Sequence, residues 1–213
     1  MPMKFTLEEY QTANAKLEEV NEDDRTYLEF YDGLVIPRQG SEPIWNLDID
    51  FLINFFNTNN MTGSTSKHSS LSSQMNHLFR IFTDENENYE VFDSGMQVVL
   101  DKIRTYLLPD VTVVESATKI IINEQLHNPL IAIEILSKGT QKKDRTIKKE
   151  AYLSCESLKD YVMIDQYSLH IEHHFRTEAG WQTEIYTNIE DSIAFAGISL
   201  VLAVNKIYKN VKF

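Results

Sequence analysis

The sequence predicts an α/β (α+β) fold in which a mixed central β-sheet is flanked by helices. Residues 130–136 form a nearly continuous apolar run, and residues 161–164 form another. Such runs are typical of central strands that are covered on both faces. Leu71, Met75 and Phe79 instead recur at helical spacing. With 213 residues the chain has the length of one domain, so we expect a single domain over residues 1–213.

Three elements are expected in the first part of the chain. Thr6 followed by acidic residues has the pattern of a helix start, which predicts an acidic N-terminal helix at about residues 6–20. Asp32-Gly33 between two apolar runs is a strong short signal for a β-hairpin, here over residues 27–36. Residues 49–56 are expected to form a short helix within residues 38–62, which we interpret as a possible insertion.

The rest of the chain mixes strands and helices. The Ser/Thr-rich residues 62–73 supply caps for a helix and place His68 near its start. The remaining apolar segments predict strands at residues 98–100, 111–114, 169–175 and 181–186, a helix at residues 144–154, and a tail at residues 193–208 that begins as a strand and ends as a helix.

The composition excludes several classes of protein. A total of 20 Lys and Arg against 32 Asp and Glu gives a net charge of −12, which argues against a tail-driven nucleic-acid binder. Cys155 is the single cysteine, so a disulfide framework and a four-thiolate zinc site are excluded. The sequence has no apolar run of roughly 18 residues, no apolar leader and no Gly-rich phosphate loop. We therefore expect a cytoplasmic protein that binds neither a membrane nor an organic cofactor.

The charge is unevenly distributed. Residues 1–32 contain nine acids and three bases, whereas residues 137–149 contain six bases and one acid. The basic segment has two readings: a solvated helix start, or a surface that meets a polyanion.

Two acids and one amine form the candidate site. Glu134 is a lone carboxylate in an apolar strand, where it needs compensation by a metal, an amine or hydrogen bonds. Asp110 begins another apolar strand, and two neighbouring strands can bring two carboxylates to one Mg²⁺ or Mn²⁺. Lys148 is the candidate amine, on one helical face with Asp144. The alternatives are that Asp110 caps a turn, that Glu134 pairs with a basic residue of the core, and that Asp144 and Lys148 form an ordinary i,i+4 ion pair.

Short motifs in a fixed order carry a resemblance. Along residues 27–187 they are Glu29-Phe30-Tyr31-Asp32-Gly33, His68 at a helix start, Pro109-Asp110-Val111, Pro129 through Glu134-Ile135-Leu136-Ser137 to Thr140, Asp144-x-x-x-Lys148-x-x-x-Tyr152, and Leu158-Lys159-Asp160-Tyr161-Val162 to Asp165. This order resembles the Uma-type restriction endonucleases, a bacterial group within the PD-(D/E)xK nuclease superfamily. The resemblance implies a restriction-endonuclease-like fold.

The resemblance also implies roles. Asp110 and Glu134 would bind Mg²⁺ (or Mn²⁺), Lys148 would be the catalytic lysine, and Glu29 and His68 would be accessory catalytic residues near the pocket. DNA would be the substrate, a homodimer is plausible for double-strand cleavage, and the basic segment would lie near the phosphate backbone. The wider superfamily has a lysine two residues after the glutamate, where this chain has Leu136. Catalysis therefore requires Lys148 to reach the site from its helix.

Three hypotheses follow. The favoured one is a metal-dependent endonuclease that hydrolyses DNA phosphodiester bonds. The alternative is a catalytically inactive module of nuclease fold that binds nucleic acid or another protein, as Leu136 and the acidic surface suggest. In a third hypothesis, the acidic N-terminal helix docks a partner protein.

Overall fold

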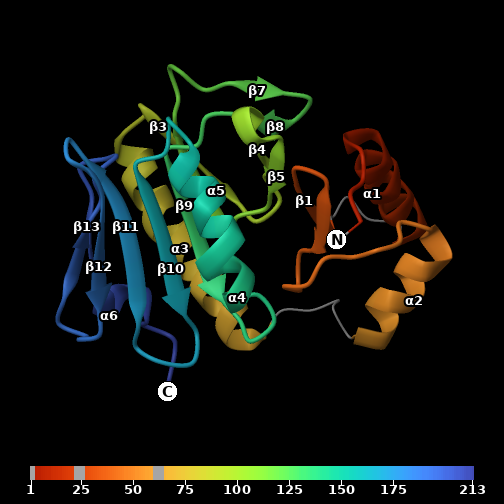
Figure 1. The fold of residues 1–213 in the computed structure, drawn as a ribbon. Helices are drawn as coiled ribbons and strands as arrows, with labels where there is room; N and C mark the ends of the chain where they lie inside the picture. Colours follow the sequence, from red (N-terminus) through yellow and green to blue (C-terminus); the bar gives the residue numbers. More distant parts are fainter. Residues whose placement is uncertain (1–2, 22–26, 60–64) are drawn as a thin grey trace.

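The computed structural model describes residues 3–21, 27–59 and 65–213. Its centre is a six-stranded sheet in the order β12-β11-β10-β9-β6-β3 (Figure 1). Strands β9 and β10 are parallel and the other neighbours are antiparallel, which confirms the predicted mixed sheet. The bounds are β3 Tyr89–Asp93, β6 Val111–Glu115, β9 Ile131–Leu136, β10 Asp160–Asp165, β11 Ile171–Thr177 and β12 Gly180–Tyr186.

Both faces of this sheet are covered. Side chains alternate between the faces of a strand. Ile131, Ile133 and Ile135 of β9 accordingly pack with helix α3 (Ser66–Glu85). Ala132 and Leu136 pack on the other face with helix α5 (Lys149–Ser154). The tail completes the α3 side with β13 (Ser192–Ala194), β14 (Val201–Ala203) and helix α6 (Val204–Ile207). Every residue of β9 is buried, as the apolar run predicts.

A second six-stranded sheet, in the order β2-β1-β5-β4-β8-β7, adds to the single sheet expected from the sequence. The predicted hairpin is present, and Asp32 (φ 44°) and Gly33 (φ 98°) supply the two positive φ angles of its tight turn. The other strands contain two or three residues each, too few to show a period of two. The bounds are β1 Leu28–Tyr31, β2 Leu34–Pro37, β4 Val98–Leu100, β5 Thr105–Leu107, β7 Ile121–Ile122 and β8 Gln125–Leu126, with a 3-10 turn η1 at Asp101–Ile103.

Helices α1 (Leu7–Asn21) and α2 (Ile49–Asn59) lie beside the second sheet, to one side of the molecule (Figure 1). Thr6 and Glu9 form a reciprocal cap at the start of α1, since each side chain accepts a hydrogen bond from the other's backbone N–H. The two helices and the β1–β2 hairpin share one apolar cluster. Residues 60–62 of the expected insertion, and residues 62–64 of the Ser/Thr-rich segment, lie outside the described residues.

The expected helix at residues 144–154 begins earlier and is not uniform. A short α4 (Gln141–Lys143) leads into a π-helical turn η2 (Asp144–Lys148), which continues into α5. Single π-helical turns inside helices are rare and frequently lie at functional sites. In this chain the turn begins at Asp144 and ends at Lys148, the candidate amine.

In the part of the chain that the structure describes, every helix is too short or too polar to cross a bilayer.

Candidate active site

The two predicted acids face each other across neighbouring strands. Val111 of β6 pairs with Ile133 of β9 in antiparallel register, which places Asp110 opposite Glu134. Asp110 is 7% exposed and Glu134 is 4% exposed. The geometry therefore brings together two carboxylates that are 24 positions apart in the sequence.

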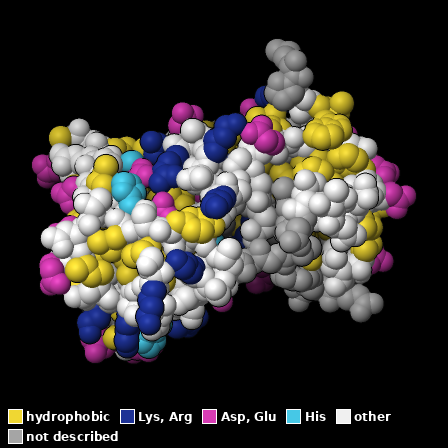
Figure 2. Space-filling view, turned by 90° about the horizontal axis from the view of Figure 1, so that it is seen from below, with side chains coloured by type: hydrophobic (Ala, Val, Ile, Leu, Met, Phe, Trp, Pro, Cys, Tyr) yellow, Lys and Arg dark blue, Asp and Glu magenta, His cyan; other side chains and the backbone are white. Residues whose placement is uncertain are grey.

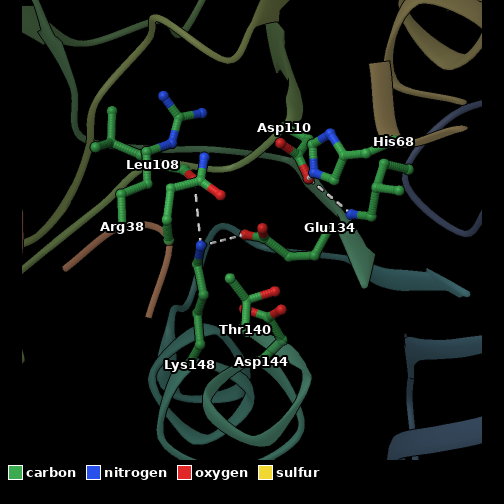
Figure 3. A pocket seen from close by; sticks show the side chains of 10 residues that line it. Arg38, His68, Leu108, Asp110, Glu134, Thr140, Asp144 and Lys148 are labelled. Atoms are coloured by element: carbon green, nitrogen blue, oxygen red, sulfur yellow. Dashed lines mark hydrogen bonds and ion pairs between the residues drawn. The ribbon is translucent and has the colours of Figure 1, made fainter. Parts of the chain in front are cut away.

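Lys148 reaches Glu134 from the helix that covers the same face of the sheet (Figure 3). Its Nζ lies 2.8 Å from Oε1 of Glu134, 2.8 Å from Oε1 of Glu29, and 3.2 Å from the carbonyl oxygen of Leu108. Asp144 is not its ion-pair partner, so the i,i+4 pair considered from the sequence is wrong. Leu136 is buried and packs in the apolar cluster on the α5 side of the sheet.

Glu29 lies behind the site and is fully buried. Its carboxylate accepts hydrogen bonds from Lys143 (2.6 Å), from the Tyr31 hydroxyl (2.9 Å) and from the Leu108 backbone N–H (3.0 Å), and it pairs with Lys148. Burial opposes its ionisation, but the two lysines outweigh burial and lower the pKa of Glu29 to about 2. Glu29 therefore holds Lys148 in place and does not line the cavity.

His68 contacts Asp110 from the start of helix α3. It follows the N-terminal cap Thr65 of α3, whose hydroxyl accepts a hydrogen bond from the His68 backbone N–H. Its Nε2 lies 3.3 Å from Oδ2 of Asp110. Burial alone would lower the pKa of His68, but the Asp110 carboxylate outweighs burial and raises it. The same contact helps to lower the pKa of Asp110 against the opposing effect of burial.

A polar cavity of about 20 Å³ lies between these groups, enough for one water-sized occupant. Figure 3 shows Arg38 and His68 on opposite sides, with the two acids between them and Lys148 below. The cavity is lined by Arg38, Gln39, His68, Leu108, Asp110, Glu134, Ile135, Thr140, Asp144 and Lys148.

Comparisons with known proteins identify the family and the fold. The family model of Uma2, "Putative restriction endonuclease", matches residues 57–205. The chain belongs to this family.

Two uncharacterized proteins of Synechocystis sp. are similar to this chain. One, sll1609, is 28% identical over 116 residues, which cover 54% of this chain and 65% of that protein, slightly less than two thirds of its length. The other, slr1290, is 25% identical over 153 residues, 72% of this chain and 80% of that protein. A crystal structure of a putative nuclease of DUF820 from Anabaena variabilis superposes with a TM-score of 0.62, at 15% identity, over 91% of this chain and 97% of that one. This likeness shows the shared fold.

Each candidate metal ligand of the Uma2 chain leaves one carboxylate oxygen without a partner among the described residues. Oδ2 of Asp110 accepts from the Ile135 backbone N–H (2.7 Å) and contacts His68, while Oδ1 makes no hydrogen bond. Oε1 of Glu134 contacts Lys148 and the Tyr152 hydroxyl (3.4 Å), while Oε2 makes none. Two open carboxylate oxygens beside a small polar cavity fit a hard cation such as Mg²⁺, which binds through one or two carboxylates and keeps several waters. Within the described residues, however, three or more His, Cys, Asp or Glu side chains nowhere gather into a metal-binding group.

The cavity is lined by more carboxylates than lysines: Asp110, Glu134 and Asp144 against Lys148. Burial first, and then neighbouring carboxylates including Asp144, raise the pKa of Glu134 well above its ordinary value, against the effect of Lys148. Burial also raises the pKa of Asp144. For Lys148, burial would lower the pKa, but the carboxylates of Glu134 and Glu29 outweigh it and raise the pKa. An additional cation in the cavity would relieve this surplus of negative charge.

Sequence reasoning did not single out Arg38 or Lys143. Arg38 directly follows the hairpin and carried no motif. Lys143 looked like one of the solvated bases of residues 137–149, but it is 1% exposed. The contacts of Lys143 with Glu29 and with the Arg38 carbonyl join residues about a hundred positions apart, from the hairpin to α4. No local sequence signal reports such contacts.

Proposed function

We propose that this Uma2-family chain is a divalent-metal-dependent endonuclease of the PD-(D/E)xK type that hydrolyses phosphodiester bonds in DNA. Membership of a family described as restriction endonucleases supports the class of reaction. The observation that carries the proposal is the pair of open carboxylate oxygens of Asp110 and Glu134, which share one cavity with the ammonium group of Lys148.

Each residue has a proposed role. Asp110 and Glu134 would hold Mg²⁺ or Mn²⁺, which supplies Lewis-acid polarisation of the phosphate and a more acidic water. Lys148 would donate a hydrogen bond to a phosphate oxygen as negative charge develops there. Glu29 would orient Lys148, and His68 would orient Asp110. In this proposal Lys148, on the helix, takes the role of the lysine that the wider superfamily has on the strand, at the position of Leu136.

A band of basic side chains on one face of the molecule supports DNA as the substrate. Seen from below, Lys and Arg side chains follow a band across the visible face (Figure 2). Lys138, two residues after the end of β9, is exposed, and its ammonium lies over the Tyr167 ring without a carboxylate partner among the described residues. Because the net charge is −12, binding to a polyanion is expected to be weak for one copy. A homodimer would double the basic band; that assembly and a cytoplasmic location stay predictions.

The experiment is nicking of a supercoiled plasmid with Mg²⁺ or Mn²⁺. Wild type should cleave, EDTA should stop cleavage, and Glu134→Gln should lower the rate by about a thousandfold because a metal ligand is lost. Glu115→Gln is the matched control, since Glu115 ends strand β6 and is exposed, away from the cavity. Equal rates for Glu134→Gln and wild type would refute the proposal.

A second candidate is a module that binds nucleic acid, or a protein, without cutting. It is favoured by the Lys148 ammonium, whose three protons are already matched by Glu29, Glu134 and the Leu108 carbonyl. This candidate predicts no cleavage by wild type with either metal, together with retained binding of a labelled DNA duplex.

A further inference from the structure

Arg38 is a cation at the cavity, close enough to Asp110 to help lower its pKa but without a direct hydrogen bond or ion pair to its side chain among the described residues. It follows strand β2, and its side chain is half-buried and lines the cavity with Asp110 and Glu134. Within the described residues the guanidinium group makes no hydrogen bond and no ion pair. Partial burial of an unpaired charge is unfavourable, because the charge loses hydration without compensation. An unpaired guanidinium facing a cavity is therefore suited to an external anion.

The backbone that carries Arg38 is held by a buried lysine. Lys143 is 1% exposed, and its Nζ donates to the carbonyl oxygens of Pro37 (3.1 Å) and Arg38 (2.9 Å) and to Oε2 of Glu29 (2.6 Å). All three ammonium protons are thus used, and two of them bind the successive backbone carbonyls of Pro37 and Arg38. Burying an ammonium group is costly, so this contact fixes the start of the segment after β2 against helix α4.

A second contact fixes the same segment independently. The carbonyl oxygen of Gln39 would lie 2.8 Å from a Cβ atom added to Gly139, so only glycine permits this approach. Beside it, the Ser41 hydroxyl donates a hydrogen bond of 2.5 Å to the Gly139 carbonyl oxygen. The turn before α4 and the segment after β2 are therefore locked together, and Arg38 leaves this junction toward the cavity.

We infer that Arg38 binds a non-bridging oxygen of the scissile phosphodiester and that Lys143 is the residue that positions it. The inference rests on the proposed nuclease function and adds a phosphate-binding residue to the side of the cavity opposite His68. A guanidinium group can donate two parallel hydrogen bonds to a phosphate. Lys148 approaches the cavity from the helix, and Arg38 approaches it from the hairpin (Figure 3). A phosphate above the two acids would then meet cations from both elements.

The first experiment compares Arg38→Ala, Arg38→Lys and Arg80→Ala under single-turnover conditions with Mg²⁺. Arg80 is the control, since it is exposed on α3, twelve residues beyond His68. Arg38→Ala should lower the cleavage rate by about a hundredfold with an unchanged Tm, because a donor to the transition-state charge is lost. Arg38→Lys should recover part of the rate, and added ethylguanidine should raise the rate of Arg38→Ala only. Rates for Arg38→Ala equal to those of Arg80→Ala would overturn the inference.

A binding measurement separates this inference from the proposed function. Fluorescence anisotropy with a labelled DNA duplex and Ca²⁺ does not require cleavage. If wild type binds the duplex but never cleaves it, the nuclease proposal fails. The role of Arg38 then stands if Arg38→Ala weakens binding by about tenfold relative to Arg80→Ala, and falls if the two variants bind equally. Absence of both cleavage and binding in wild type overturns both.

The role of Lys143 is tested by a double-mutant cycle. If Lys143 acts through Arg38, Lys143→Met should lower the cleavage rate, and Arg38→Ala/Lys143→Met should be no slower than Arg38→Ala alone. Effects that multiply would show that Lys143 acts independently of Arg38. Should Lys143→Met fail to fold, Gly139→Ala provides the second route, because it displaces the Gln39 backbone. It should slow cleavage in the wild-type background and not in the Arg38→Ala background.

Discussion

Asp160 and Glu134 are both buried acids on neighbouring strands of the central sheet, but their oxygens are used differently. The carboxylate of Asp160 is completely enclosed by the chain. Its Oδ1 pairs with Nε2 of His173 at 2.8 Å and accepts from the Ala196 backbone N–H at 2.8 Å, and its Oδ2 accepts from the Gly197 N–H at 2.7 Å. Glu134 uses one oxygen and leaves the other open beside a cavity.

This contrast separates an acid whose oxygens are all bound by the chain from an acid that we propose binds a ligand. The single carboxylate of Asp160 binds three groups: the His173 ring and two backbone N–H groups. Removing the carboxylate therefore leaves these groups without an acceptor. Around Glu134 the acids are in surplus, since Asp110 and Asp144 also line the cavity. Burial of like charges costs stability, and this cost is the reason for the proposal that a cation from outside the chain binds there.

The largest expected effect concerns the stability of these two sites. Asp160→Ala should lower the free energy of unfolding by about 3–5 kcal/mol, because it leaves buried donors without an acceptor. Glu134→Gln should leave the stability unchanged or raise it, since Lys148 keeps Glu29 as a partner. Urea unfolding at pH 7 without metal measures both values.

For the rate of DNA cleavage, we expect the opposite order of effects from the Asp160 and Glu134 variants. Folded Asp160→Ala should cleave DNA at nearly the wild-type rate, whereas Glu134→Gln should be slower by about a thousandfold. A strongly destabilised Glu134→Gln variant would place Glu134 among the structural acids and remove the contrast.

The central sheet and the two candidate acids could be predicted because each is marked by a short stretch of neighbouring residues. A long apolar run identifies β9, and one carboxylate within it is conspicuous from the sequence alone. The predicted neighbourhood of Asp110 and Glu134 agrees with the register of β6 and β9. The predicted hairpin and the predicted strand at residues 98–100 form part of the second sheet. Strands β7 and β8 contain two residues each and carry no period, so the assembly of these pieces into one sheet could not be predicted.

The lysines show where local reasoning ends. Within the basic segment, Lys142 is exposed and its neighbour Lys143 is almost fully buried. The acceptors that allow Lys143 to be buried are distant in sequence, and its carboxylate partner Glu29 lies 114 positions away. The π-helical turn η2 could not be foreseen from the sequence either, although it begins directly after Lys143.

The next effect is a pH dependence that separates Glu29 from the acids in the cavity. Because the folded state lowers the pKa of Glu29 from 4.5 to about 2, its ionised form stabilises the fold. This contribution is fully present above about pH 4.5 and is lost as the pH falls toward 2. The shift corresponds to roughly 3 kcal/mol. The stability of wild type should therefore fall more steeply than that of Glu29→Gln between these pH values.

Urea unfolding at a series of pH values provides the measurement, with the difference between the two proteins as the readout. Other groups that titrate in this range contribute to both proteins and cancel in the difference. Parallel pH profiles would mean that the two lysines do not hold Glu29 ionised in the folded state.

The smallest expected effect compares the adjacent lysines. Lys142 pairs with Glu42 at 2.7 Å, and both side chains are more than 70% exposed. Such surface pairs contribute little, because solvent screens them and ordering the two side chains costs entropy. Lys142→Ala should therefore change the free energy of unfolding by about 0.5 kcal/mol or less, and the change should shrink in high salt. Lys143→Ala, measured in the same urea series, should cost several times more because Glu29 and two backbone carbonyls lose a buried donor. Similar losses for the two variants would show that Lys143 is solvated in solution, and the junction that carries Arg38 would then lack its support.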